Sequence, residues 1–317
     1  MATYAAKLRS TGVDGQTIRV GTDGRLRGNA GMEPFSAGTS GGAPSTFYVD
    51  GNVISSGNGL GWLSAFKTLT EGLAAAHAYM STDGNRAWAQ RATVYCCGDN
   101  LTENLVILAE RTDIIGVGSS GGYTKCILDG GHVPITTNCW GTRWYNMAFA
   151  KTATGILWTL TAPSGGIEFH DCIFSSRGPT HTIGIKATAV GSMKVHDCVF
   201  EAAPPDFSTT AIDILAGDAA QTEIMRSYIV GAIGIRVDAG MTATAGQLRI
   251  DSNIIRSSGK VIADASNIAV VTRNRGITDV AEATPGDMWD GDAKYWCDNI
   301  ITGSSGTADQ VPYVSEA

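Results

Sequence analysis

The chain has 317 residues, of which 43% are hydrophobic and 17% charged, and its formal net charge is -7. This composition suffices for a large buried core, and forty glycines indicate a turn-rich architecture. The acidic balance and the lack of a Lys/Arg cluster argue against nucleic-acid binding, because that affinity depends on clustered cations. No window approaches 18 uninterrupted apolar residues, so no membrane-spanning helix is expected.

Residues 1–45 are rich in Gly, Thr and Ser, and we interpret them as an N-terminal arm. Two turn signals, Val13-Asp14-Gly15 and Thr22-Asp23-Gly24, flank the run Thr17-Ile18-Arg19-Val20 and predict one small hairpin. The arm cannot build its own core. It is either disordered or ordered against another chain, which would make it an attachment or oligomerisation device. The first residues lack the apolar core of a signal peptide, so Sec export is not indicated.

Residues 46–91 predict an initial loop followed by one amphipathic helix. Ser64 is the expected N-cap of a helix whose apolar residues recur at helical spacing, at Phe66, Leu69, Leu73, Ala76 and Met80. A stack of β coils leaves unpaired backbone and apolar surface at its end. The helix is therefore predicted to cap such a stack.

Between residues 92 and 276 the chain repeats one β unit. The clearest copies, residues 167–174 and 193–200, lie 26 positions apart and share the sequence His-Asp-Cys. One apolar residue per copy recurs at steps of 25, 26, 29, 26 and 21 positions, at Trp144, Phe169, Val195, Ile224, Ile250 and Val271. A unit of this length, made of short β-branched and aromatic runs, buries its apolar face only by stacking on its neighbours.

Each copy changes phase after this apolar position, which predicts a tight corner between two strands. The inward position three residues later holds small or polar residues that can hydrogen-bond in a ladder, although a broken one, at Cys172, Cys198, Ser227, Asn253 and Asn274. A second column follows 11 to 17 residues farther on, at Ile156, Ile185, Ile212, Ile235 and Val261. Each coil therefore supplies about three short strands.

The seven cysteines are scattered and odd in number, without a C-x-x-C pair, at positions 96, 97, 126, 139, 172, 198 and 297. Neither a disulfide framework nor a zinc site is predicted, and we assign no metal and no cofactor. Reduced, mostly buried thiols are the favoured interpretation. A redox pair at Cys96 and Cys97 is the weaker alternative to a strand end whose side chains face opposite ways.

Residues from about 46 to 276 resemble the right-handed parallel β-helix of the pectin-lyase-like superfamily. The resemblance rests on Tyr48-Val49-Asp50-Gly51, on residues 59–69, and on Ala92-Thr93-Val94-Tyr95 with residues 101–105. It implies an all-β fold: a right-handed parallel β-helix over residues 92–276, with an N-terminal capping helix, an extended arm, and a C-terminal cap and tail over 277–317. The superfamily includes polysaccharide lyases, glycoside hydrolases, bacterial surface proteins and phage virion proteins, so the fold does not decide the function.

Two pairs on neighbouring copies are the best catalytic candidates, His170 with His196 and Asp171 with Asp197. If the two carboxylates stack, one pKa would rise, as in an acid/base dyad. Both pairs nevertheless belong to the repeat, where a corner takes Asp or Asn regardless of chemistry. The next copies replace the Asp with Arg226, Ser252 and Arg273. We therefore assign no catalytic residue.

Other candidate sites are fragmentary. The hydrolase signatures of the superfamily are missing, and only Gly130-Gly131-His132 and Gly184-Ile185-Lys186 come near them. A lyase needs acids that converge opposite Arg or Lys, for which the scattered candidates are Asp213, Glu223, Arg226, Arg236 and Asp238. Aromatic residues able to stack on sugars cluster around one copy, at Trp140, Trp144, Tyr145 and Trp158, although Trp144 falls in the inward column.

The sequence favours a non-enzymatic structural or adhesive protein. Domains that resemble this one are frequent in tailed-phage virions as head decoration proteins, fibres or tail spikes, and homotrimers are common among them. The resemblance implies a virion protein made in the host cytoplasm, docked through its arm onto other proteins of the capsid or tail, with host surface glycan as a further partner. The alternatives are a polysaccharide-degrading tailspike-type lyase or hydrolase, and a bacterial surface adhesin, which would need an export route.

Overall fold

The computed structural model of the chain describes residues 19–20, 26–27, 45–81, 90–98, 101–106, 108–118, 125–134, 140–161, 164–176, 181–188, 190–202, 207–216, 221–241, 248–266, 268–280, 283–291, 295–304 and 308–310. The chain divides into two units, residues 1–44 and 45–317. In the first unit, β1 (Arg19–Val20) pairs antiparallel with β2 (Leu26–Arg27), where the sequence predicts a hairpin. The rest of the arm lies outside the described residues.

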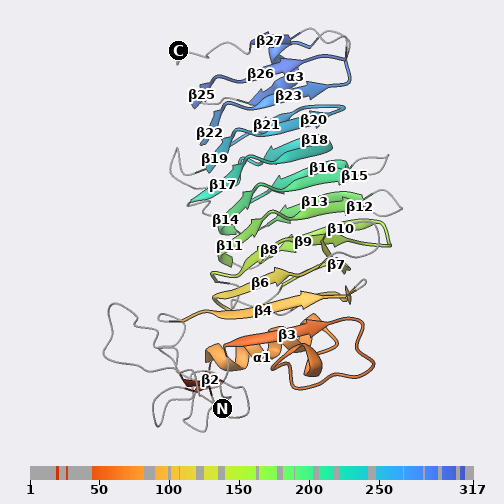
Figure 1. The fold of residues 1–317 in the computed structure, drawn as a ribbon. Coiled ribbons are helices and arrows are strands. Elements are labelled where there is room, and N and C mark those ends of the chain that lie inside the picture. The colour runs from red at the N-terminus through yellow and green to blue at the C-terminus, as the bar shows by residue number, and fades with distance from the viewer. Residues whose placement is uncertain are drawn as a thin grey trace. The chain divides into compact units, whose positions relative to one another are not determined.

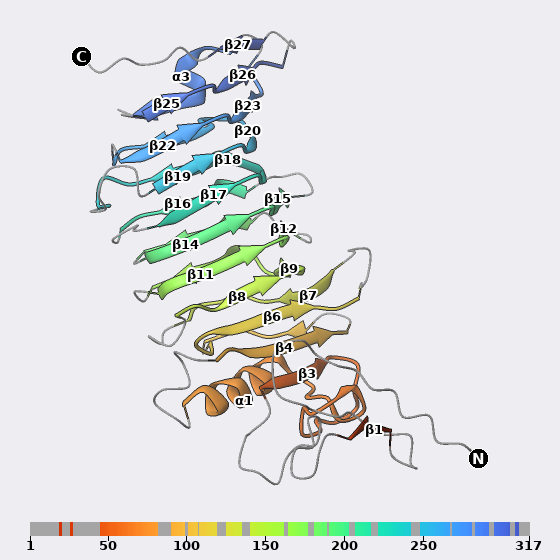
Figure 2. The ribbon, with the colours of Figure 1, turned by 60° about the vertical axis from the view of Figure 1, so that its left-hand side comes forward.

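The second unit is a parallel β-solenoid, mostly β, with one short helix near its N-terminal end (Figures 1 and 2). A 10-stranded sheet, here sheet B, contains β3 (Thr46–Asp50), β4 (Ala92–Cys97), β6 (Thr112–Gly116), β8 (Arg143–Tyr145), β11 (Ser164–His170), β14 (Val190–His196), β17 (Thr222–Met225), β19 (Leu248–Asp251), β22 (Ala269–Thr272) and β25 (Tyr295–Cys297). These strands pair in parallel, so each coil of the chain lies directly on the one before it.

A 15-stranded sheet, here sheet C, forms the other walls of the solenoid. Its main path runs through β5 (Leu101–Thr102), β7 (Cys126–Asp129), β9 (Met147–Ala150), β12 (Ile173–Ser176), β15 (Val199–Ala202), β18 (Tyr228–Val237), β20 (Ile254–Ser257), β23 (Arg275–Thr278), β26 (Ile300–Thr302) and β27 (Ala308–Gln310). A second row joins this path through the long strand β18 and contains β10 (Gly155–Leu160), β13 (His181–Ala187), β16 (Phe207–Ile214), β21 (Ile262–Asp264) and β24 (Trp289–Gly291). Three strands per coil, as the sequence predicts, follow from this arrangement.

The predicted apolar column is confirmed residue by residue. Phe169 pairs with Trp144 on one side and with Val195 on the other, and the series continues through Ile224, Ile250 and Val271. The same register extends the column beyond the predicted residues, to Phe47, Val94, Ile114 and Trp296. All of these side chains are buried in the core.

The second column is confirmed at its centre and shifted at both ends. Ile185, Ile212 and Ile235 stack in register, as expected. Ile185 pairs with Trp158 rather than Ile156, and Ile235 pairs with Ile262 rather than Val261. A bulge next to Ile156 shifts the first of these registers, and a local irregularity of this kind leaves no periodic signal in the sequence.

A tight corner separates sheet B from sheet C, as the phase change predicts. The residue two places after the apolar column has a positive φ, between 49 and 59°, at Asn146, Asp171, Asp197, Arg226, Ser252, Arg273 and Asp298. Asn and Asp tolerate this left-handed conformation better than other non-glycine residues, which accounts for four of the seven. The repeated Asp therefore suits the backbone of the corner, although Arg and Ser adopt the same conformation in other coils.

The next residue of each corner forms a polar ladder inside the solenoid. Each backbone N–H donates to the side chain one coil later: Cys198 to Ser227 Oγ at 3.1 Å, Ser227 to Asn253 Oδ1 at 2.9 Å, Asn253 to Asn274 Oδ1 at 3.0 Å and Asn274 to Asn299 Oδ1 at 2.9 Å. Each Asn Nδ2 donates back, at 2.9 Å, to a carbonyl of the coil before, of Ile224, Ile250 and Val271. The ladder is continuous over these coils, where we expected a broken one.

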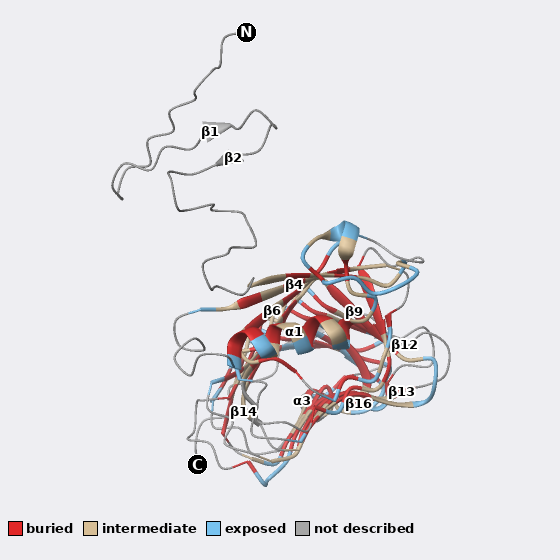
Figure 3. Ribbon diagram, turned by 90° about the horizontal axis from the view of Figure 1, so that it is seen from below, coloured by how far each residue is buried: buried red, intermediate tan, exposed pale blue. Residues whose placement is uncertain are grey.

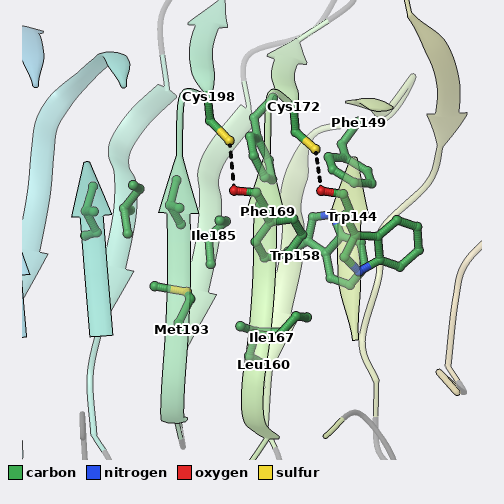
Figure 4. Packing of buried hydrophobic residues seen from close by; sticks show 14 of the residues in the cluster. Trp144, Phe149, Trp158, Leu160, Ile167, Phe169, Cys172, Ile185, Met193 and Cys198 are labelled. Carbon is green, nitrogen blue, oxygen red and sulfur yellow. Dashed lines mark hydrogen bonds between the residues drawn. The ribbon is translucent and has the colours of Figure 1, made fainter. Parts of the chain in front are cut away.

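Large aromatic side chains fill the core beside this corner (Figure 4). The Trp158 ring lies 5.2 Å from those of Trp144 and Phe149 and 5.3 Å from that of Phe169, all in edge-on contacts. The thiols of Cys172 and Cys198 occupy the ladder position in these coils and donate to the carbonyls of Trp144 and Phe169 at 3.6 and 3.4 Å. Cys96, Cys126, Cys172 and Cys198 are free and buried, as predicted, whereas Cys139 lies outside the described residues.

Helix α1 (Leu69–Ser81) lies at the N-terminal end of the solenoid, beside β3 and β4, and its buried face includes Leu73 and Ala76 (Figure 3). The predicted cap helix is present, but its predicted N-cap is wrong. Ser64 belongs to the 3-10 turn η1 (Trp62–Ser64), and the helix starts after Thr68, whose Oγ1 accepts from Glu71 N–H while Glu71 accepts from Thr68 N–H. This capping box replaces Ser64 because it bonds both backbone groups reciprocally.

The parallel pairing continues past residue 276. Strands β25 and β26 add one more coil, with Trp296 in the apolar column and Asn299 in the ladder, and the short helix α3 (Pro285–Met288) precedes β24. The last described strand, β27, pairs antiparallel with β26. Residues 311–317 of the predicted tail lie outside the described residues. Within the described part of the chain, no helix is long and apolar enough to cross a membrane.

Candidate functional site

Over six successive coils the outer face of sheet B carries one charged side chain per coil, directly before the apolar column, and the sign alternates. The residue before the apolar column is, in stacking order, Asp113, Arg143, Glu168, Lys194, Glu223 and Arg249. We call these six residues the charge column. Parallel strands lie about 4.8 Å apart, so each charge has an opposite charge above or below it.

On this face, Glu168 is surrounded by three basic side chains. Its carboxylate lies 3.2 Å from Arg143 Nε, 3.4 Å from Lys194 Nζ and 2.9 Å from His170 Nε2. Burial opposes ionisation of this carboxyl, but the His170 hydrogen bond and the two cations outweigh it and hold its pKa at about 2. A carboxylate with so low a pKa cannot act as a general acid near neutral pH.

Asp171 and Asp197 do not form the dyad considered from the sequence. Asp171 Oδ1 lies 2.7 Å from Lys125 Nζ, and Asp197 accepts two bonds of 2.8 Å from the Arg226 guanidinium. The Arg226 hydrogen bonds lower the pKa of Asp197, the opposite of the shift that a shared proton would cause. Asp171 and Asp197 are thus each neutralised by a cation of their own.

His170 and His196 do lie together, as stacking predicts. Their ring centroids are 5.3 Å apart, and Tyr145 stacks on His170 at 5.0 Å with nearly parallel rings. His196 Nε2 lies 3.0 Å from Glu223. Burial, then the neighbouring His170, lowers the pKa of His196. Each imidazole contacts a Glu of the charge column: His170 contacts Glu168, and His196 contacts Glu223. These contacts give both rings a structural role.

The candidate lyase residues do not converge. Glu223 lies on sheet B and Asp213 on sheet C, so they belong to different faces. The buried Asp213 carboxylate accepts two bonds of 2.6 Å from Arg236, and Asp238 accepts from the backbone N–H of Gly240 at 3.1 Å. Only Lys186, next to Asp213 in register, adds a further cation to this row. Among the side chains that the structure describes in this row, Asp213 is accompanied by Lys186 and Arg236.

The aromatic candidates separate into core and surface residues. Trp144 and Trp158 are fully buried, so neither can stack on a sugar. Tyr145 is partly exposed against His170, and Trp140 is 38% exposed with the Arg111 guanidinium 4.6 Å from its ring centroid. Of the four aromatic candidates, only Tyr145 and Trp140 reach the surface.

His132, part of a fragment that comes near a hydrolase signature, is a core residue. It pairs with Trp158 in the second column, and its Nδ1 accepts from the backbone N–H of Leu105 at 3.3 Å. Burial, with a smaller contribution from the Lys151 charge, lowers the pKa of His132 to about 3. This neutral, fully buried imidazole cannot contact a polysaccharide substrate.

Two ion clusters are absent from the candidates named from the sequence. One is Glu168 with its cations, and the other is the buried Asp251, which accepts two bonds from Arg273 and one from Arg249. Burial opposes ionisation of Asp251, but these hydrogen bonds and charges hold its pKa at about 2. Both clusters join neighbouring coils. The alternation of sign in the charge column was the available signal.

Among the residues described in the structure, no group of three or more His, Cys, Asp or Glu side chains is arranged to hold a metal ion. The chain was also compared with protein-family models, with curated proteins and with solved structures. None of the three comparisons gives a match.

Proposed function

We propose that the chain is a non-enzymatic structural or adhesive virion protein: a right-handed parallel β-helix that docks through its arm, residues 1–45, onto a phage capsid or tail. The pairing of outward acids with cations carries the proposal. Glu168, Asp197 and Asp213 are each fixed by Arg, Lys or His on a neighbouring coil. Such pairs stiffen the contact between coils, and the lowered pKa values of Glu168 and Asp197 keep these two carboxylates ionised.

The interior supports a rigid stalk in the same way. Buried ladder amides satisfy the backbone of consecutive coils, and a buried polar network with every partner present rigidifies a core. Rigidity suits a projecting element of a particle. The partners are then the other virion proteins that receive the arm, together with host surface glycan, for which Trp140 offers an exposed ring. A homotrimer is the assembly that the family resemblance implies.

Electron microscopy of particles tests this function. Gold-labelled antibodies against the chain should mark the capsid or the tail of phage from the source culture. A chain that lacks residues 1–45 should no longer be incorporated, whereas a control that lacks residues 311–317 should be. Label on the host envelope alone, or incorporation without the arm, contradicts the proposal.

The alternative function is that of a polysaccharide-degrading lyase or hydrolase. The row of Lys186, Asp213 and Arg236 is the observation that favours it, because it sets an acid between two cations on one outer face. The purified chain would be incubated with capsular and alginate-like polymers while reducing ends and unsaturated sugars are measured. Release of either that is lost in Asp213→Asn would establish the alternative, whereas no release supports the structural function.

A further inference from the structure

Lys125 carries a buried amine that lies against side chains of the next two coils. Its side chain is 10% exposed, and its Nζ lies 3.1 Å from Asn146 Oδ1 and 2.7 Å from Asp171 Oδ1. The Nζ also donates to the backbone carbonyl of Asp171. An amine can attack a carbonyl carbon when an adjacent base takes its proton. The three side chains therefore bring together a nucleophile, a carboxamide and a base.

The register of the solenoid places these groups side by side. Strands β7, β9 and β12 pair in parallel, and Lys125, Asn146 and Asp171 stand just before them in three successive coils. The lysine reaches past Asn146 to Asp171, two coils away. Groups that the fold already holds in contact react far faster than groups that must first meet.

The Asn146 amide is held in one orientation. Its Nδ2 donates to the Gly116 carbonyl at 2.8 Å, and its Oδ1 accepts from Lys125. Its backbone is also fixed, because Asn146 is a corner residue with a φ of 54°. The amide carbon Cγ, which is bonded to Oδ1, is thus kept next to the lysine amine.

The neighbouring ion pairs have a different chemistry. Asp197, at the next corner, pairs with Arg226, whose guanidinium remains protonated and so is a poor nucleophile. Lys194 Nζ lies 3.4 Å from the carboxylate of Glu168. Lys125 differs from both cations because its amine contacts an amide and a carboxylate together.

We propose that Lys125 and Asn146 join in an intramolecular isopeptide bond, with Asp171 as the general base. The Nζ lone pair forms a bond to Asn146 Cγ, and the bond between Cγ and Nδ2 breaks. Asp171 takes two protons from Nζ in turn, and Nδ2 gains two protons and leaves as ammonium. Water can relay these protons, because the Asp171 side chain is 69% exposed.

This step exchanges one amide for another, so it needs no oxidant. The chain modifies itself once and turns over no substrate, which is compatible with a structural protein. The bond would tie the coil of β7 to the coil of β9. It does not depend on the virion function, which the gold labelling tests separately.

Mass spectrometry of the denatured full chain tests this bond. We expect the wild type to be lighter than the Lys125→Arg variant, after allowance for the substitution, by about 17 Da, the mass of ammonia. Trypsin should no longer cleave after Lys125, and the peptide that contains this residue should stay joined to Trp144–Lys151. An equal mass, or a loss confined to Asn146 with normal cleavage after Lys125, would overturn the proposal.

Two variants separate the reacting groups from the ion pair. Lys125→Arg keeps a cation beside Asp171 but removes the amine, and Asp171→Asn removes the base while it suits the left-handed corner. Both should retain the ammonia. Asp197→Asn, the same change one coil farther on, is the matched control and should lose it as the wild type does. Loss of ammonia in Asp171→Asn would contradict the role of Asp171. The wild-type peptide map alone decides whether the bond exists, so a misfolded variant cannot hide the result.

Discussion

At the scale of single residues, the ladder asparagines perform two tasks that no apolar side chain can. Asn274 Oδ1 accepts the backbone N–H of Asn253, and its Nδ2 donates to the carbonyl of Ile250. Asn253 follows the corner residue Ser252, Ile250 lies in β19, and both residues are buried. A buried backbone group without a partner costs about 1–3 kcal/mol. The side chain is therefore part of the backbone hydrogen bonding of the solenoid.

Replacing Asn274 with Ala should lower the free energy of unfolding by about 1–3 kcal/mol, because the buried Asn253 N–H would lose its acceptor. Asn274→Ser should cost less. Ser227 shows why, since its hydroxyl accepts from the coil before and donates to Met225 in the same position. Denaturant unfolding of both variants measures the difference. Equal losses of unfolding free energy in Asn274→Ala and Asn274→Ser would show that the acceptor oxygen kept by serine makes no separate contribution to stability.

His132 should make the protein less stable in acid. Its folded pKa is about 3, whereas an unfolded histidine titrates near 6.5. Below pH ~6.5 the unfolded state binds a proton that the folded state does not bind. The contribution of His132 to stability is therefore full above pH ~6.5 and falls as the pH drops from that value toward the folded pKa of about 3. The slope for this one group approaches about 1.4 kcal/mol per pH unit.

Replacing His132 with Asn isolates this effect, because the Asn oxygen can still accept from Leu105 and does not titrate. The difference in unfolding free energy between wild type and His132→Asn should shrink as the pH falls from about 6.5. Denaturant unfolding at a series of pH values measures it. A constant difference over that interval would mean that the folded chain protonates His132 as readily as the unfolded chain does.

At the scale of elements, the strands could be predicted from the sequence. The contacts between strands of neighbouring coils could be predicted only in part. The repeat gave the register of sheet B, because any slip would move Phe169 and its equivalents out of the core. The last coil could not be predicted from the sequence, because helix α3 and β24 replace the segment that precedes the repeat in earlier coils. Trp296, Asn299 and Ile301 nevertheless keep the spacing of the earlier copies. Ion pairs such as Glu168 with Arg143 join residues 25 positions apart, so only alignment of the outward positions reveals them.

Gly72 sets how closely helix α1 approaches the first coil. A Cβ at this position would lie 2.6 Å from Val49 Cγ2 and 3.2 Å from Val94 Cγ1. Gly72→Ala should therefore lower the unfolding free energy by about 1–2 kcal/mol, even though alanine favours a helix. Gly61→Ala, which meets no atom within 4 Å, is the control. A more stable Gly72→Ala would show that the helix can move away without loss.

At the scale of the whole solenoid, the two ends differ. At the N-terminal end, β3 is covered on its outer edge: Tyr48 N–H donates to Gly59, and Asp50 N–H donates to Phe66. At the other end, no described strand of sheet B lies beyond β25. Each coil contacts mainly its neighbours, so an end that lacks a cover opens first.

Hydrogen exchange followed by mass spectrometry should show this asymmetry. Amides of β25 should exchange before those of β3, and those of β11 and β14 should be the slowest. Gly72→Ala, which loosens the N-terminal cover, should speed exchange at β3 and leave β25 unchanged. Uniform exchange along the stack would indicate that the solenoid opens only as one cooperative unit.

The alternating signs of the charge column have a consequence for growth of the stack by duplication. Copying one coil, such as residues 168–193, would place two glutamates next to each other between Arg143 and Lys194. Copying two successive coils, residues 168–222, would keep every plus beside a minus. Lengthening the charge column without setting like charges side by side therefore requires an even number of added coils.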